Sequence, residues 1–154
     1  MHEEALIHGT CVAIGAEGVL LVGKPGSGKS DLALRLIDQS GLGLSGNARA
    51  AQLVADDQVV IRKVEGALIA SAPASLKGKL EIRGLGIAEL SVVAETRLRL
   101  AVRLTPAAEI ERLPDLGTAR MEVLGIGLPL VLLDPEQASA PARLRAALDQ
   151  FVQG

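Results

Sequence analysis

The sequence predicts an α/β domain with a mixed β-sheet, and three observations support this. Residues 18–22 form a short apolar run bounded by glycines, which indicates a buried strand. After a glycine-rich segment, residues 30–38 place apolar side chains at helical spacing. A tight turn at residues 15–18 joins the buried strand to an earlier apolar run at residues 5–14, which we interpret as one strand. That pairing is an antiparallel hairpin, whereas an all-parallel nucleotide-binding sheet would need a crossover there.

The glycine-rich segment, residues 23–30, reads GKPGSGKS and fits the pattern G-x-x-x-x-G-K-[ST] of loops that bind nucleotide phosphates. Lys29 supplies a cation for the β- and γ-phosphates, and Ser30 offers a hydroxyl to Mg²⁺. The helix beginning near Lys29 adds the positive end of its dipole. We also expect the rest of the loop and the residue after it to take part in binding the nucleotide: Gly23, Gly26, Ser27, Gly28 and Asp31. Because strand and helix flank the loop correctly, nucleotide binding is the firmest inference from the sequence.

Composition narrows the class of protein. The 154 residues suffice for one domain spanning residues 1–154, with a core of aliphatic side chains. Phe151 is the one aromatic residue and the net charge is −2, which argues against nucleic acid as a partner. The single cysteine, Cys11, excludes an internal disulfide. No signal peptide or membrane-spanning run is evident, so we expect a soluble, cytoplasmic protein without a membrane partner.

The other elements follow in order along the chain. Residues 40–47, rich in glycine and serine, predict an exposed and mobile connection. Residues 97–104 alternate apolar with charged side chains, as in a strand with one face in water. The remaining predicted elements are a strand at 52–55, a hairpin of 59–61 with 67–70, strands at 80–87, 121–124 and 130–133, and a final helix at 138–152.

Two acidic stretches compete for the metal-handling position of the nucleotide site. Asp56 and Asp57 follow one apolar strand, and Asp134 follows another. Asp134 comes after the cleaner strand pattern, yet Pro135 makes it equally typical of an ordinary strand end. Two adjacent carboxylates repel each other unless a cation or donor offsets the repulsion, which favours Asp56 and Asp57 as the chemical pair.

His8 and Glu81 each have two interpretations. A lone histidine on a strand is more often structural than catalytic. Glu81 lies between Leu80 and Ile82 in the strand predicted over residues 80–87, so it faces opposite to them, with Arg83 on its own side. Glu81 therefore lies either on a solvated face or in a position to bind a metal.

Four stretches occur in an order that resembles the catalytic domain of HPr kinase/phosphorylase: HGT at 8–10, the loop at 23–30, LVADD at 53–57 and LEIRGLGI at 80–87. The last stretch is similar to that family's own signature, and the resemblance covers about the first 90 residues. It implies a phosphate-loop fold akin to phosphoenolpyruvate carboxykinase, with helices on one side of a mixed sheet, and a hexamer in the family's usual form.

The resemblance implies a serine kinase that uses ATP and Mg²⁺ to phosphorylate the phosphocarrier protein HPr, and in many members also its phosphate-dependent dephosphorylation. Asp56 would be the base that takes the proton from the attacking serine, with His8 beside it or the transferred phosphate. Lys29 would keep its role in the loop. Glu81 would help Ser30 to hold Mg²⁺, with Asp57 in support.

The sequence also departs from longer members of the family. His8 comes almost at the start, so we expect no separate N-terminal domain, as in a short form found in some proteobacteria. Asp31 replaces a usual Glu, the connection over residues 41–52 is longer, and the stretch Pro-x-Arg-Pro-Gly-Arg-Asn is not found. Two other functions stay open: a small-molecule kinase, although residues 84–104 lack an arginine-rich lid, and a non-catalytic nucleotide sensor, against which the acidic pair speaks.

Overall fold

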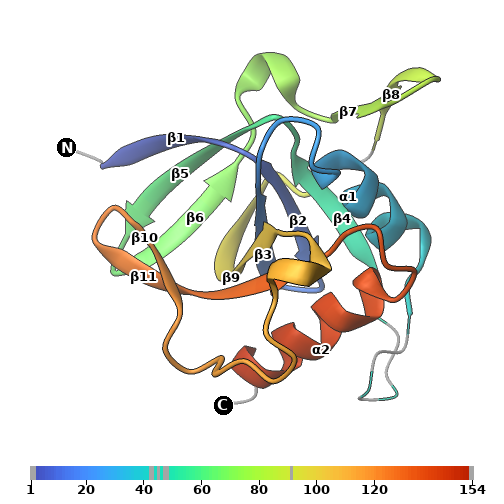
Figure 1. Cartoon of the computed structure of the whole chain (residues 1–154). Helices are drawn as coiled ribbons and strands as arrows, with labels where there is room; N and C mark the ends of the chain where they lie inside the picture. The colour runs from blue at the N-terminus through green and yellow to red at the C-terminus, as the bar shows by residue number, and fades with distance from the viewer. Residues whose placement is uncertain (1–2, 42–43, 45, 47–48, 91, 153–154) are drawn as a thin grey trace.

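One curved sheet organises the chain, as the computed structural model shows (Figure 1). The structure describes residues 3–41, 44, 46, 49–90 and 92–152. Seven strands follow the order β1-β5-β6-β9-β3-β2-β4, and the hairpin β10–β11 joins the sheet at β9. These strands are β1 (Glu4–His8), β2 (Thr10–Ile14), β3 (Glu17–Val22), β4 (Ala51–Ala55), β5 (Gln58–Val64), β6 (Ala67–Ser71), β9 (Glu95–Leu104), β10 (Arg120–Val123) and β11 (Ile126–Leu133).

The sheet is mixed, which confirms the prediction made from the turn before the phosphate loop. β2 runs antiparallel to β3, while β9 runs parallel to β3 on its other side. β11 in turn runs parallel to the second half of β9. The carboxyl ends of β3, β9 and β11 therefore meet at one edge of the sheet, where ligands of α/β domains commonly bind.

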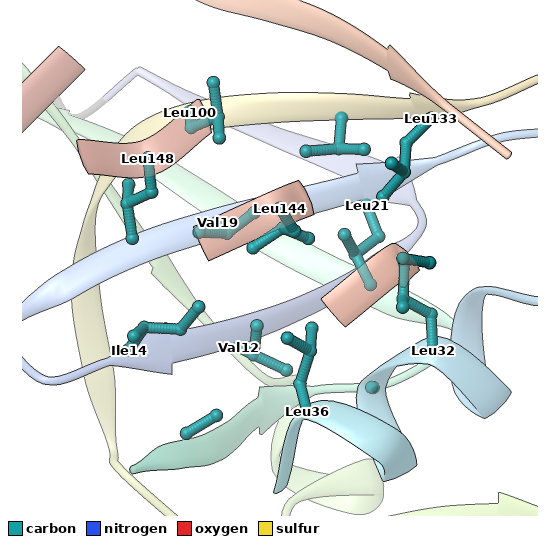
Figure 2. Close-up of a cluster of buried hydrophobic side chains, with 14 of the residues drawn as sticks. Val12, Ile14, Val19, Leu21, Leu32, Leu36, Leu100, Leu133, Leu144 and Leu148 are labelled. Atoms are coloured by element: carbon teal, nitrogen blue, oxygen red, sulfur yellow. The ribbon is translucent and has the colours of Figure 1, made fainter. Parts of the chain in front are cut away.

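Both helices, α1 (Lys29–Asp38) and α2 (Ala140–Val152), pack on the same face of the sheet, as predicted. Figure 2 shows Leu32 and Leu36 of α1 and Leu144 of α2 directed toward side chains of β2 and β3. A second apolar cluster fills the concave opposite face, where β5, β6, β10 and β11 curve over the central strands. Because both faces are covered, the middle of β9 is buried even at Ala101. The alternation predicted for residues 97–104 is confirmed at the three arginines, of which Arg97 and Arg103 are exposed and Arg99 is half-buried, and it fails at Ala101.

The strand predicted over residues 5–14 is wrong as one element, because it divides at Gly9 into two strands with different partners. β1 pairs with β5, whereas β2 pairs with β3 and β4. A Cβ at Gly9 would lie 2.7 Å from the carbonyl oxygen of Leu21, so only glycine lets the chain pass this close to β3. The division places His8 and Thr10 on either side of the bend.

The strand predicted over residues 80–87 is also two strands, β7 (Lys79–Ile82) and β8 (Gly86–Glu89), which form a separate hairpin. Gly84 and Gly86 have φ values of 87° and 120°, conformations that glycine adopts readily and that turn the chain back. The hairpin projects from the body of the domain above α1 (Figure 1). The two glycines within the apolar run are the sequence signal for this turn.

The other predicted elements are confirmed. β5 and β6 form the expected hairpin around Glu65 and Gly66, β10 and β11 form another, and α2 begins two residues later than predicted, at Ala140. Two one-turn 3₁₀ helices, η1 (Ala74–Leu76) and η2 (Ala107–Glu109), lie in connections. Much of the connection predicted at residues 40–47 lies outside the described residues. Within the described part of the chain, neither helix is long and apolar enough to span a bilayer.

Candidate active site

The phosphate-binding motif forms a loop between β3 and α1. Gly28 is the N-cap of α1 with a φ of 101°, and its lack of a side chain leaves the first amide groups of the helix open to a ligand. Gly26 also has a positive φ, of 79°. A Cβ at Gly23 would lie 2.6 Å from the Ser27 hydroxyl oxygen, so the loop closes tightly on itself. This geometry explains the glycine spacing and forms a cradle of backbone N–H groups.

Lys29 lies across this loop. Its side chain is 8% exposed, and its ammonium group donates hydrogen bonds to the carbonyl oxygens of Gly23, at 3.0 Å, and Lys24, at 3.1 Å. These acceptors hold a positive charge over the mouth of the loop. A phosphate bound there would meet the charge without a large movement of the lysine.

Asp56 lies at the centre of the site, 7% exposed, at the carboxyl end of β4. Its Oδ1 accepts hydrogen bonds from the hydroxyls of Thr10 and Ser30, both at 2.8 Å. Its Oδ2 faces the backbone N–H of Glu81 at a longer 3.5 Å. One oxygen is thus held by two donors on different elements, while the other retains capacity to accept a proton.

The backbone turns sharply after Asp56. Asp57 has a φ of 68°, the left-handed conformation that aspartate tolerates better than most residues. The turn is fixed by the hydrogen bonds from Gln58 N to the Asp56 carbonyl oxygen, at 2.8 Å, and from Gly9 N to the Asp57 carbonyl oxygen, at 3.0 Å. In an extended strand, the side chains of Asp56 and Asp57 would point to opposite faces. Because the backbone turns between them, both side chains line the same cavity.

His8 and Asp57 form the exposed margin of the site. His8 Nδ1 lies 3.6 Å from Asp57 Oδ1, and the two side chains are 53% and 65% exposed. They come from the ends of β1 and the β4–β5 turn, which the pairing of β1 with β5 brings together. At this exposure their contact contributes little to stability.

A cavity of about 440 Å³ joins these groups. Its walls include every predicted residue of the site except two members of the loop, Gly23 and Ser27, which face a second cavity behind the loop. Glu81 and Arg83 of the β7–β8 hairpin also line the cavity. The cavity thus combines a phosphate cradle, a fixed cation and a buried carboxylate, a combination suited to moving a phosphoryl group.

Comparisons with known proteins give the family of the chain. The family model described as the HPr Serine kinase C-terminal domain matches residues 1–144. The HPr kinase/phosphorylase of Clostridium acetobutylicum is 34% identical over 82% of this chain and 41% of its own, and that of Geobacillus thermodenitrificans is 38% identical over 80% and 40%. The structure of the Hpr(Ser) kinase/phosphatase from Coxiella burnetii matches 95% of this chain and 88% of that chain, with a TM-score of 0.75 and 27% identity.

The chain belongs to the HPr serine kinase C-terminal domain family. It spans about 40% of the length of the curated relatives it matches. The predicted resemblance is therefore confirmed, and it extends well beyond the first 90 residues that suggested it.

The competing carboxylate, Asp134, has a different environment. Its Oδ1 accepts from Glu136 N at 2.9 Å and its Oδ2 from Ala107 N at 3.0 Å. The two oxygens thus accept hydrogen bonds from backbone amides of two segments, η2 and the residues after β11, on the far side of the phosphate loop from Asp56. Asp134 therefore stabilises the backbone of the two connections to which it is hydrogen-bonded.

Thr10 is the residue that sequence reasoning missed. It is fully buried and it links β2 to Asp56 through its hydroxyl. The available signal was a polar residue opening an apolar strand, next to a histidine already under consideration. Its neighbour Cys11 is not a further nucleophile, because complete burial raises the pKa of the thiol far above its ordinary value.

The described side chains do not form a complete metal cage: no three histidine, cysteine or acidic residues among them lie close enough to bind one ion. Mg²⁺ usually binds one or two protein oxygens and takes its other ligands from water and substrate phosphates. Ser30 donates its proton to Asp56, which leaves the lone pairs of its own oxygen available. The oxygen atoms that line the cavity therefore fit a magnesium ion that takes its other ligands from a nucleotide and water.

Proposed function

We propose that this domain transfers the γ-phosphate of ATP, bound with Mg²⁺, to a serine hydroxyl of an HPr-type phosphocarrier protein in the cytoplasm. The observation that carries the proposal is Asp56, buried beside the phosphate loop with one oxygen fixed by Thr10 and Ser30. The membership of the chain in the HPr serine kinase family supports the choice of acceptor.

The residues of the chain divide the work. The amides of the loop and Lys29 bind and orient the β- and γ-phosphates. The serine oxygen attacks the γ-phosphorus, and Oδ2 of Asp56 accepts the serine proton. The bond between the γ-phosphorus and the β-phosphate oxygen breaks at the same time, and ADP leaves. A magnesium ion held by Ser30, with Asp57 and Glu81 near it, would neutralise the charge of the phosphates. His8 at the cavity margin would contact the transferred phosphate or Asp57.

The same site supports the reverse transfer in outline. The curated relatives carry the name HPr kinase/phosphorylase. With inorganic phosphate as the attacking group, Asp56 would return its proton to the serine oxygen as that oxygen leaves phosphorus, and the products would be serine and pyrophosphate. We include this activity in the proposal for the domain.

The direct test is to incubate the purified domain with labelled ATP, Mg²⁺ and HPr, and to locate the phosphate by mass spectrometry. We expect one phosphoserine on HPr, formed by the wild-type domain and not by Asp56→Asn. A domain that binds ATP but labels no serine of HPr would instead be a nucleotide sensor or a kinase for another acceptor. Adding inorganic phosphate to phosphorylated HPr, without ATP, tests the reverse reaction through the release of pyrophosphate.

A further inference from the structure

Arg35 of α1 contacts a segment of the chain that lies 100 residues further on. All three nitrogens of its guanidinium donate hydrogen bonds. Nη2 donates to the carbonyl oxygen of Pro135, Nη1 to that of Gln137 at 3.4 Å, and Nε to Asp31 Oδ2 at 3.1 Å. The side chain is 23% exposed and lines neither the catalytic cavity nor the cavity behind the loop. One flat group therefore joins α1 to the connection between β11 and α2 (Figure 1).

That connection, residues 134–137, packs against the phosphate loop. Pro135 Cγ lies 3.5 Å from the position that a Cβ would take at Gly28, so the proline ring lies beside the N-cap of α1 at ordinary contact distance. No side chain caps the helix at this end. The conformation of Gly28, whose φ is 101°, therefore depends on the groups that pack around it.

The connection is held by contacts from three elements. Asp134 accepts a hydrogen bond from Ala107 N of η2, and the carbonyl oxygen of Gln137 accepts one from Ala140 N at the start of α2, both at 3.0 Å. Arg35 adds the link to α1, the helix whose first turn faces the phosphates. Without Arg35 the links to η2 and α2 remain, so the domain should keep its fold while the part of the connection beside the loop loosens.

Arg35 also affects the charge beside the phosphates. Asp31, in the first turn of α1, lines the catalytic cavity and is 68% exposed. Its carboxylate repels a bound phosphate, and the ion pair with Arg35, four residues on, offsets part of that repulsion. Water screens a pair at this exposure, so the effect of the charge should be smaller than that of holding Pro135.

We propose that Arg35 is a positioning residue for the phosphate loop: it holds Pro135 against Gly28 and offsets the charge of Asp31. The loop thereby keeps the shape and the positive potential that a nucleotide needs. This inference rests on the proposed function only in requiring that a nucleotide binds in the loop. It deepens that function by adding a residue outside the phosphate-binding motif that acts on the motif through a distant part of the chain.

The test measures the affinity for ADP with Mg²⁺ by calorimetry, which needs no acceptor protein. We expect Arg35→Ala to weaken ADP by about tenfold, because the connection loosens at Pro135 and Asp31 loses its partner. Arg62→Ala is the matched control: Arg62 is 32% exposed and pairs with Glu95 at 2.7 Å, but it lies on β5 and lines neither cavity. Its ADP affinity should stay within about twofold of the wild type. Thermal unfolding of both variants checks the fold.

Arg35→Lys separates geometry from charge, and it keeps the test decisive if Arg35→Ala fails to fold. Lysine retains a positive charge near Asp31, but its ammonium group cannot reproduce the planar fork that holds two carbonyl oxygens and a carboxylate at once. We therefore expect Arg35→Lys to weaken ADP by about fivefold. In the double variant Asp31→Asn/Arg35→Ala the unpaired carboxylate is gone, and ADP affinity should recover by about twofold relative to Arg35→Ala.

Amide hydrogen exchange reports on the connection directly. The amides of Glu136 and Gln137 both donate to Asp134, the first to Oδ1 and the second to the carbonyl oxygen. We expect their exchange to be about tenfold faster in Arg35→Ala and Arg35→Lys than in the wild type and Arg62→Ala, and bound ADP to slow it. A general loss of stability would instead speed exchange throughout the sheet.

Several outcomes would overturn the inference: unchanged ADP affinity in Arg35→Ala, an equal loss in Arg62→Ala, full affinity in Arg35→Lys, or unchanged exchange at Glu136. No recovery in the double variant would overturn the part assigned to Asp31. A wild-type domain that binds ADP but does not phosphorylate HPr would contradict the proposed function and leave these measurements interpretable. Unchanged affinity in the Arg35 variants would leave the kinase proposal standing.

Discussion

The two sides of the catalytic cavity differ in how firmly they are built. On one side, Lys29, Thr10 and Asp56 are buried: Lys29 donates hydrogen bonds to the loop, and Asp56 accepts hydrogen bonds from Thr10 and Ser30. On the other, His8, Asp57 and Glu81 are exposed and come from strand ends and a hairpin outside the main sheet. The first side is fixed before any ligand arrives. The second is free to adjust.

This difference suits the order of events in phosphoryl transfer. Positioned donors and charges act best when they need no rearrangement in the transition state, which the buried side provides. A metal that arrives with its nucleotide, and a large protein acceptor, both need side chains that can move toward them. We therefore expect substitutions on the buried side to reduce the maximal rate of transfer. Substitutions on the exposed side should instead change the concentrations of Mg²⁺ and acceptor protein that are needed for half-maximal rate.

The largest effect should come from Lys29→Ala. The variant removes the one cation fixed over the loop, and with it stabilisation of the charge that develops on the transferred phosphate. We expect transfer to HPr to fall by about three orders of magnitude, with the fold intact because the hydrogen bonds of the lysine go to loop carbonyls and not to the core. Initial rates and thermal unfolding measure both. Wild-type turnover in this variant would contradict the assignment of the nucleotide site.

Asp56→Asn should follow. The amide keeps the shape of the carboxylate but cannot take the serine proton, a step that contributes typically about 10²–10⁴-fold. We expect transfer to fall by at least about two orders of magnitude, while ADP affinity changes little. The two quantities are measured by phosphate transfer and calorimetry. If Asp134→Asn loses transfer and Asp56→Asn does not, the base lies on the other acidic strand.

Much of the buried side could be predicted from the sequence, because it rests on local patterns. The spacing of the loop glycines with Lys29 and Ser30 is a contiguous signal, and the strand that ends at Asp56 is another. The hydrogen bond from Ser30 to Asp56 joins the loop to this strand. Local patterns do not encode such a long-range contact, and only the resemblance to a family suggested it. Thr10 was missed for the same reason: its partner lies 46 residues away.

The exposed side was predicted less well, because glycines there change the path of the chain. Gly9 divides a strand that looked continuous, and Gly84 with Gly86 fold the signature stretch into a hairpin. In each case apolar residues occur on both sides of the turn, so the sequence shows no loss of apolar character there. Close backbone packing, such as that of Gly9 on Leu21, is a tertiary property with no local signal.

Thr10→Val tests whether the buried side acts as a unit. Valine keeps the volume of threonine but removes one of the two donors to Asp56 Oδ1, within a fully buried site. We expect about a tenfold loss of transfer and a loss of about 1 kcal/mol in the free energy of unfolding. Thr10→Ser, which keeps the hydroxyl, should recover most of the rate. Equal rates in Thr10→Val and the wild type would mean that Ser30 alone suffices to orient the carboxylate.

Glu81→Gln should have the smallest effect and the most specific one. Glu81 is exposed on β7, and only its backbone N–H reaches Asp56, so the substitution leaves the buried hydrogen bonds unchanged. A neutral side chain at the cavity wall attracts Mg²⁺ less strongly than a carboxylate. We expect the Mg²⁺ concentration for half-maximal rate to rise by about three- to tenfold, with the rate at saturating Mg²⁺ reduced by less than about twofold.

The matched control for that prediction is Glu89→Gln on β8, a carboxylate on the same hairpin that lines neither cavity. Both substitutions remove one negative charge from the hairpin, so a general electrostatic effect on Mg²⁺ would appear equally in both. A shift confined to Glu81→Gln would assign the metal to the cavity wall. Equal Mg²⁺ curves for the two variants and the wild type would return Glu81 to a solvated strand face. In that case the metal would depend on Ser30, Asp57 and the phosphates, and the exposed side would serve the acceptor protein alone.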